Sequence, residues 1–138
     1  MELLLLMFFC LLTGSEVTFG AEKKDITVDE GSDVMLPCSL NTTDITQEKF
    51  EWMTDGRQVF LYDDGNHSNI AVKGQDQQFR GRVKHFPDEL KSGNASITIR
   101  NMTVDDSGEY TCEFPNLQPR QIVHMNLDVG EYFDKTLI

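Results

Sequence analysis

Three cysteines carry the most reactive side chains of this 138-residue chain: Cys10, Cys38 and Cys112. A cysteine thiol can attack a substrate, bind a metal ion, or be oxidised with a second thiol to a disulfide. No Cys-x-x-Cys motif occurs, so the sequence gives no sign of a zinc ribbon or a dithiol redox site. Cys38 and Cys112 lie 74 positions apart, which leaves a long-range disulfide or two buried thiols as the alternatives.

The N-terminal segment bears on this choice. Residues 3–12 form an apolar run that is too short to span a bilayer, and residues 18–20 end in the small-residue pattern of a cleavage site. We expect residues 1–20 to be a secretory signal peptide, although no Lys or Arg precedes the apolar run; a buried N-terminal strand or helix is the alternative. Cleavage would remove Cys10 and leave one possible pairing, Cys38 with Cys112, in an oxidising compartment.

The mature chain would hold 118 residues, enough for one domain over residues 21–130 and a C-terminal tail or start of a linker over residues 131–138. Its net charge would be −9 instead of −11, because Glu2 and Glu16 leave with the signal. Such acidity argues against nucleic acid and against electrostatic docking on anionic lipid. We attribute it to solubility.

Residue patterns typical of enzymes are missing from the sequence. It contains no Gly-x-Ser-x-Gly, His-Glu-x-x-His or phosphate-binding glycine-rich loop. His67, His85 and His124 are 18 and 39 positions apart, so they show no local metal-ligand spacing. The acidic pairs 63–64 and 105–106 fall in expected turns, where Asp is favoured for backbone reasons. The sequence therefore predicts neither catalysis nor a cofactor nor a metal site.

Short segments of alternating polarity, broken by turn residues, predict an all-β fold. The expected strands cover residues 26–28, 34–38, 50–52, 59–62, 82–86, 97–99 and 122–129, and a further strand carries Thr111, Cys112 and Glu113. Met102 should fill the core beside the strand at 97–99, and Met125, Leu127 and Val129 should point inward. Pro37 predicts that the second strand lies at a sheet edge, because proline cannot donate to a central ladder.

Two aromatic residues connect these strands to the cysteines. Trp52 follows Cys38 by 14 positions, and Tyr110 precedes Cys112 by two. In a variable-type immunoglobulin sandwich a tryptophan packs on the inter-sheet disulfide, and a tyrosine at this position ties a turn back to the backbone. The agreement of the three spacings predicts an immunoglobulin-like two-sheet sandwich of the variable (V-set) type, with residues 59–62 as its additional strand.

Arg82 and Asp106 form a second expected structural pair. Arg82 opens a strand, and Asp106 begins the run Asp-Ser-Gly-Glu-Tyr-Thr-Cys that ends at Cys112. In this fold such residues commonly form an ion pair that closes the bottom of the sandwich. We interpret the pair as structural and not as part of a functional site.

One sheet face is the expected contact surface. By strand alternation its solvent side carries six residues: Glu51, Met53, Thr111, Glu113, His124 and Asn126. Met53, if exposed there, would be a suitable contact anchor, because a flexible thioether adapts to irregular surfaces. Scattered exposed apolar residues are also normal, so this surface is a hypothesis.

Four Asn-x-Ser/Thr sequons predict N-linked glycans, at Asn41, Asn66, Asn94 and Asn101. Asn94 and Asn101 flank the expected strand at 97–99, on the sheet opposite the six-residue surface. Glycans there would shield that side and leave the other face open to partners. Some of the four sequons can be unoccupied or fortuitous.

Three segments of the chain form a recognisable combination. They are Gln-Asp-Gln-Gln-Phe-Arg-Gly-Arg at 75–82, Gly-Asn-Ala-Ser-Ile-Thr-Ile-Arg-Asn-Met at 93–102, and the run at 106–112. Together they resemble the membrane-distal domain of the butyrophilins, myelin-oligodendrocyte glycoprotein and the T-cell costimulatory ligands. The resemblance covers about residues 25–129, and Phe-Arg-Gly-Arg is its most specific part.

The resemblance implies an extracellular binding module that regulates T-cell activation and cytokine production by binding a protein receptor on T cells or other immune cells. Adhesion, including homophilic self-association, is the alternative. Such proteins usually continue into a constant-type domain and a membrane helix, whereas this chain stops eight residues past Gly130. A secreted single domain, a splice product and a truncated gene model are all compatible with that end, and a membrane anchor would lie outside the chain.

Overall fold

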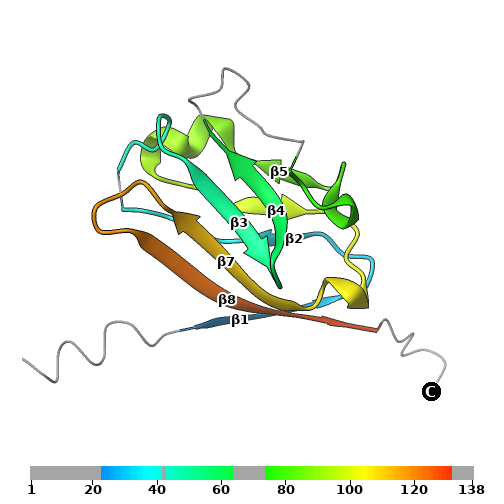
Figure 1. Cartoon of the computed structure of the whole chain (residues 1–138). Helices are drawn as coiled ribbons and strands as arrows, with labels where there is room; N and C mark the ends of the chain where they lie inside the picture. The colour runs from blue at the N-terminus through cyan, green and yellow to red at the C-terminus, as the bar shows by residue number, and fades with distance from the viewer. Residues whose placement is uncertain (1–22, 42, 64–73, 132–138) are drawn as a thin grey trace, which may run out of the picture.

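Eight strands in the described part of the chain form two sheets that pack face to face (Figure 1). The computed structural model describes residues 23–41, 43–63 and 74–131. The strands are β1 (Lys24–Asp29), β2 (Val34–Leu36), β3 (Phe50–Thr54), β4 (Arg57–Tyr62), β5 (Val83–His85), β6 (Ile97–Ile99), β7 (Gly108–Phe114) and β8 (Gln121–Gly130). The same residues include the 3-10 helices η2 (Gln77–Phe79), η3 (Pro87–Ser92) and η4 (Val104–Asp106). The expected signal peptide and the tail after Glu131 lie outside the described residues.

The larger sheet has the strand order β1-β8-β7-β3-β4, and the smaller has the order β2-β6-β5. β1 runs parallel to β8, whereas the other ladders are antiparallel. β4 is the additional strand that distinguishes the variable type, and it lies at the edge of the larger sheet. The predicted all-β sandwich is therefore confirmed.

The core forms where the inward side chains of the two sheets meet. Along β7 the residues alternate, so that Tyr110, Cys112 and Phe114 are buried while those between them face outward. The expected inward residues of β8, Met125, Leu127 and Val129, are buried as well. Trp52, Phe50, Ile97, Ile99 and Met102 are fully buried between the layers.

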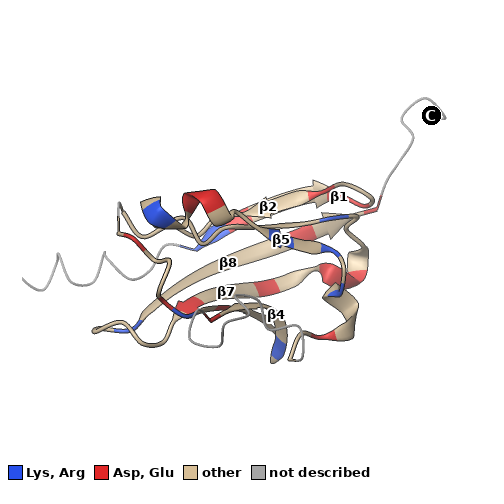
Figure 2. Ribbon diagram, turned by 90° about the horizontal axis from the view of Figure 1, so that it is seen from above, with Lys and Arg blue, Asp and Glu red and all other residues tan. Residues whose placement is uncertain are grey.

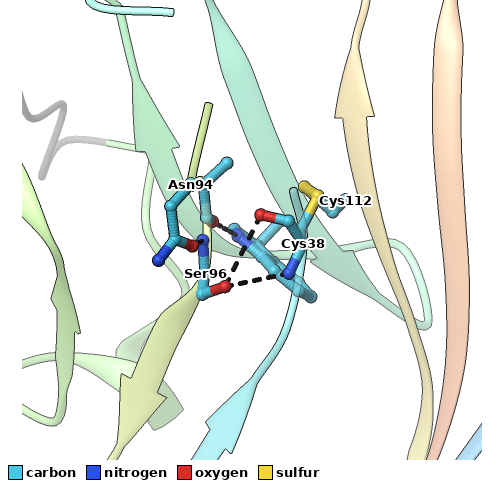
Figure 3. The surroundings of a disulfide bond; sticks show 6 residues. Cys38, Asn94, Ser96 and Cys112 are labelled. Carbon is cyan, nitrogen blue, oxygen red and sulfur yellow. Dashed lines mark hydrogen bonds between the residues drawn. A yellow bond between two sulfur atoms is a disulfide. The ribbon is translucent and has the colours of Figure 1, made fainter. Parts of the chain in front are cut away.

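The disulfide between Cys38 and Cys112 links the two sheets, because Cys38 follows β2 and Cys112 lies in β7. Trp52 is the register partner of Cys112, and its indole Nε1 donates a hydrogen bond to the Ala95 carbonyl at 2.9 Å. Beside the bridge, the Cys38 amide donates to Ser96 Oγ at 3.0 Å (Figure 3). These bonds satisfy polar groups that would otherwise be buried without partners.

The end of the sandwich where β7 begins is closed around Asp106. The Tyr110 hydroxyl donates to the Asp106 carbonyl at 2.6 Å, as the tyrosine spacing predicted. Arg82 contacts the Asp106 carboxylate with both terminal nitrogens, at 2.6 Å and 3.3 Å. The carboxylate also accepts from the Thr103 amide at 2.8 Å and from the Gln78 side chain at 2.7 Å.

This environment determines the charge state of Asp106. Its side chain is fully buried, and burial alone would raise its pKa. The hydrogen bonds from Arg82, Thr103 and Gln78 act in the other direction and outweigh burial, so the pKa of Asp106 lies below its ordinary value. Asp106 is therefore a buried carboxylate that stays charged because it is paired.

Two segments differ from the sequence-based expectation. The second strand ends at Leu36, before Pro37, although β2 is at a sheet edge as proline predicted. A 3-10 helix that the sequence did not predict, η3, lies between β5 and β6 and ends at Ser92, with Gly93 as its C-cap. Gly93 has φ 88°, and a Cβ there would lie 2.0 Å from the Leu40 carbonyl oxygen. Only glycine fits both the backbone conformation and the space.

His85 lies on β5, the edge strand of the smaller sheet. It is half-buried, with its ring centroid 5.2 Å from that of Phe60 and 5.8 Å from that of Tyr62. Burial holds the pKa of His85 below its ordinary value, because a charged imidazolium would lose hydration there. His85 therefore packs as a neutral ring at the open edge between β4 and β5.

We predict that Cys112→Ser lowers the free energy of unfolding by about 4 kcal/mol, because the reduced chain regains the freedom of a long loop. Urea unfolding of the purified domain measures the loss, and secretion from transfected cells should fall with it. Cys10→Ser is the control and should change neither property. Peptide mass mapping that finds both thiols free in secreted, folded protein would contradict the pairing.

Asp106→Asn should lower the free energy of unfolding by about 3 kcal/mol, because it leaves Arg82 without its anionic partner. The exposed neighbour offers a control, Asp105→Asn, which should stay within about 0.5 kcal/mol of the parent. The contribution of Asp106 should be complete above the ordinary pKa of 3.8 and be lost as the pH falls through the lowered folded-state value. Urea midpoints measured from neutral to acidic pH should converge for parent and variant; parallel curves would refute this linkage.

Candidate partner-binding face

The outward side of the larger sheet presents a regular surface. We call it the front face and define it by ten outward residues of β3, β4, β7 and β8: Glu51, Met53, Gln58, Leu61, Glu109, Thr111, Glu113, Ile122, His124 and Asn126. They face outward because the residues between them point into the core. The six residues predicted for a contact surface all belong to this face.

The row nearest the loop between β7 and β8 alternates apolar and acidic residues. Register pairs place Leu61 opposite Glu51, Glu51 opposite Glu113, and Glu113 opposite Ile122. Glu51 accepts a hydrogen bond from the Gln58 amide nitrogen at 2.8 Å. Glu113 pairs with Arg120 from the loop, with 2.7 Å between Oε1 and Nε.

The next row has no carboxylate at its centre. Met53 lies opposite Gln58 on β4 and opposite Thr111 on β7, and Thr111 lies opposite His124. Met53 is half-buried between these neighbours and is not the exposed anchor that the sequence suggested. Ile122, at 39% exposure, is the most exposed of the large apolar side chains on this face.

A third group joins the face to the start of β1. Glu109 accepts from Lys23 Nζ at 2.9 Å and lies 3.2 Å from His124 Nδ1. The hydrogen bond from Lys23, and to a lesser extent the one with His124, hold the pKa of Glu109 below its ordinary value. The group is exposed, so it orients side chains on the surface more than it stabilises the fold.

Glu109, Gln58, Leu61 and Ile122 are members of the front face that the sequence reasoning did not name. Period-two alternation could have found Ile122 and Glu109, because each is two positions from a predicted residue of the same strand. Gln58 and Leu61 depend on a register shift between Trp52 and Met53, where β4 carries one extra residue. Alternation alone does not reveal such a bulge.

The shape of the front face suits a broad contact. Its depression has a volume of about 260 Å³ and is lined by Met53, Thr54, Asp55, Gly56, Glu109 and Thr111. This is below the size of a typical small-molecule site, about 300–1,000 Å³. In the described residues no three His, Cys, Asp or Glu side chains gather as a metal site would require. The chemistry available to this face is noncovalent recognition.

Three of the four sequons lie in the described part of the chain. Asn94 precedes β6 and pairs with Ser39, and Asn101 follows β6 with an exposed side chain. Asn41 is exposed in the segment after β2. None of these three asparagines belongs to a front-face strand. Asn66 and the neighbouring His67 lie outside the described residues.

Charge is distributed unequally over the two sheets. Figure 2 shows acidic segments along β7, which carries Glu109 and Glu113. The outward row of the smaller sheet, in contrast, consists of Met35, Thr98 and the basic Lys84.

Across the described residues, no helix combines the length and the apolar character needed to cross a membrane.

The family model for the immunoglobulin V-set domain matches residues 21–129. V-set domain-containing T-cell activation inhibitor 1 of Homo sapiens is 30% identical over 86 residues, 59% of this chain and 29% of that protein. The CD276 antigen homolog of Xenopus laevis is 29% identical over 128 residues, 83% of this chain and 40% of that protein. The chain thus spans well under half the length of these relatives.

Bovine butyrophilin, a solved structure, superposes with a TM-score of 0.70 at 24% identity, over 80% of this chain and 53% of that chain. At this identity the likeness concerns the fold. A disulfide-bonded domain of this kind is consistent with an extracellular location. The chain therefore belongs to the immunoglobulin V-set family, a family of binding domains and not of enzymes, and is related within it by sequence to the butyrophilins, T-cell activation inhibitor 1 and CD276.

Proposed function

We propose that this chain is an extracellular ligand domain that regulates T-cell activation and cytokine production by binding a protein receptor through its front face. The relation to butyrophilins, CD276 and T-cell activation inhibitor 1 supports the immune role. T-cell activation inhibitor 1 is named for an effect on T-cell activation, and we extend that class of effect to this chain. Whether this chain stimulates or inhibits is an outcome of the experiment.

The observation that carries the proposal is the position of the sequons relative to the front face. Asn94 and Asn101 lie at the two ends of β6, the central strand of the smaller sheet. Glycans there would cover the smaller sheet with bulky, hydrated groups. The front face, with β3 and β7 in its middle, would remain open to a protein partner. A surface left uncovered in this way is the natural place for recognition.

The proposed role also explains why the front face is mixed in character. Its apolar side chains, Leu61, Met53 and Ile122, are separated by polar and charged residues. Protein interfaces that form and dissociate are about as apolar as the rest of a surface, in contrast to the cores of permanent dimers. The face therefore fits a reversible contact between two folded proteins.

Thr111→Tyr should abolish saturable binding of the labelled, glycosylated domain to activated T cells, because a bulky ring in the middle of the front face blocks close approach. The matched control is Thr98→Tyr, which places the same ring at the centre of the smaller sheet, on the opposite side. Tyrosine is favourable in strands, so both variants should fold. Flow cytometry measures binding, and cytokine release measures the effect on activation.

Equal binding of the two variants would overturn the assignment to the front face, and the absence of saturable binding by the parent domain would overturn the receptor role. Sedimentation of the parent domain at high concentration addresses homophilic adhesion. Dimers that Thr111→Tyr disrupts would favour adhesion over receptor binding.

A further inference from the structure

Two glutamates face each other across the middle of the front face. Glu51 and Glu113 are register partners on the antiparallel strands β3 and β7. Directly opposed residues of such strands have Cβ atoms about 4.5–5.5 Å apart, and like charges at this spacing destabilise a sheet. The fold would be served better by opposite charges at these positions. The pair is therefore a local cost that the sandwich itself does not require.

The surrounding residues offset this cost only in part. Arg120 places a guanidinium on Glu113, whose side chain is 23% exposed, but Arg120 itself is 59% exposed on the loop between β7 and β8. Glu51 accepts from the neutral Gln58 amide, and no cation of the described residues contacts its carboxylate. Within residues 23–41, 43–63 and 74–131, one negative charge of the pair thus lacks a cationic partner, at a half-buried position.

Apolar side chains border the two carboxylates. Leu61 flanks Glu51 on the β4 side, and Ile122 flanks Glu113 on the β8 side. A basic side chain combines an aliphatic stem with a charged head, so it can lie on apolar groups while its head reaches a carboxylate. Arginine adds a planar guanidinium that can bridge two carboxylates.

We propose that the row Leu61–Glu51–Glu113–Ile122 is the recognition centre of the front face and accepts an arginine or lysine side chain from a basic patch on the partner. This inference rests on the proposed function and adds the chemistry of the partner. Arg120 is an example of such a contact within the chain, because its guanidinium already pairs with the carboxylate of Glu113. The partner's cation binds at Glu51 beside Arg120, or takes the place of Arg120.

Charge also disfavours a second copy as the occupant. In a two-fold symmetric contact centred on this row, each chain presents the same patch, so the glutamates of both copies would meet. The whole chain carries a formal net charge of −11, which adds long-range repulsion between copies. A basic partner gains from the same field, which accelerates encounter at low ionic strength.

The direct test titrates the isotope-labelled domain with N-acetyl-arginine amide and follows the backbone amide signals by NMR. We expect the largest shifts at residues 51, 61, 113 and 122, and none of comparable size with N-acetyl-leucine amide. Removing both charges, in Glu51→Gln with Glu113→Gln, should lower the affinity for the arginine probe about tenfold, which corresponds to one charge-assisted hydrogen bond. Arg120→Gln should raise that affinity, because Glu113 loses its internal cation.

Asp128→Asn is the matched control, because it removes an exposed carboxylate from β8 outside the row. It should leave the affinity for the probe unchanged. Neutralising the glutamates relieves repulsion, so the double variant should melt no lower than the parent, which separates loss of binding from loss of folding. Shifts spread evenly over all acidic residues, or equal weakening by Asp128→Asn, would overturn the proposal.

The cell-binding assay separates this inference from the proposed function. If T cells bind the parent domain, added salt and the double glutamate variant should both weaken binding. Binding that neither changes would refute the basic partner while leaving the receptor role intact. If T cells do not bind the domain but the probe maps to the row, the receptor role fails and the cation-accepting row stands.

Discussion

The covalent link between Cys38 and Cys112 is the constraint around which the other contacts are arranged. Cys112 lies in β7, the central strand of the larger sheet, while Cys38 follows the edge strand of the smaller one. The bridge therefore fixes the separation of the two layers at one point. Trp52 can then fill the space beside it, with its only polar atom bonded to the Ala95 carbonyl. Trp52 is also the register partner of Cys112, and the residues on either side of this pair point outward.

A second, noncovalent interaction closes the end of the sandwich where β7 begins. Arg82, before β5, and Asp106, before β7, join the two sheets through a buried carboxylate. Taking this charge out of water is costly, so an ion pair of this kind adds less net stability than its short distances suggest. The five hydrogen bonds that the Asp106 carboxylate accepts, and the Tyr110 hydroxyl on the Asp106 carbonyl, instead determine how the chain enters β7. The disulfide holds the layers together, and Asp106 sets where the central strand begins.

The sequence predicted what depends on local pattern. Residue spacing located the bridge, Trp52 and Tyr110, and alternation identified the buried side of β7 and β8, because a sheet with one buried face enforces a period of two. It did not predict η3, whose C-cap Gly93 lies against the Leu40 carbonyl, or the half-buried ring of His85. Both depend on contacts between segments far apart in the chain. The bulge between β3 and β4 decided which residues join the front face, and no local pattern marked it.

The front face is where the demands of the fold and the residues present diverge. Inward positions such as Trp52 and Cys112 have little freedom, because volume and bonding are fixed by the opposite sheet. Outward positions of β3 and β7 face solvent and could carry any residue that tolerates a strand. Opposed glutamates are an unfavourable choice there, although charges of opposite sign would fit the same backbone. Local rules are broken in folded proteins mainly where function requires it. On the proposed recognition role, the pair Glu51 and Glu113 therefore reflects the partner more than the sandwich.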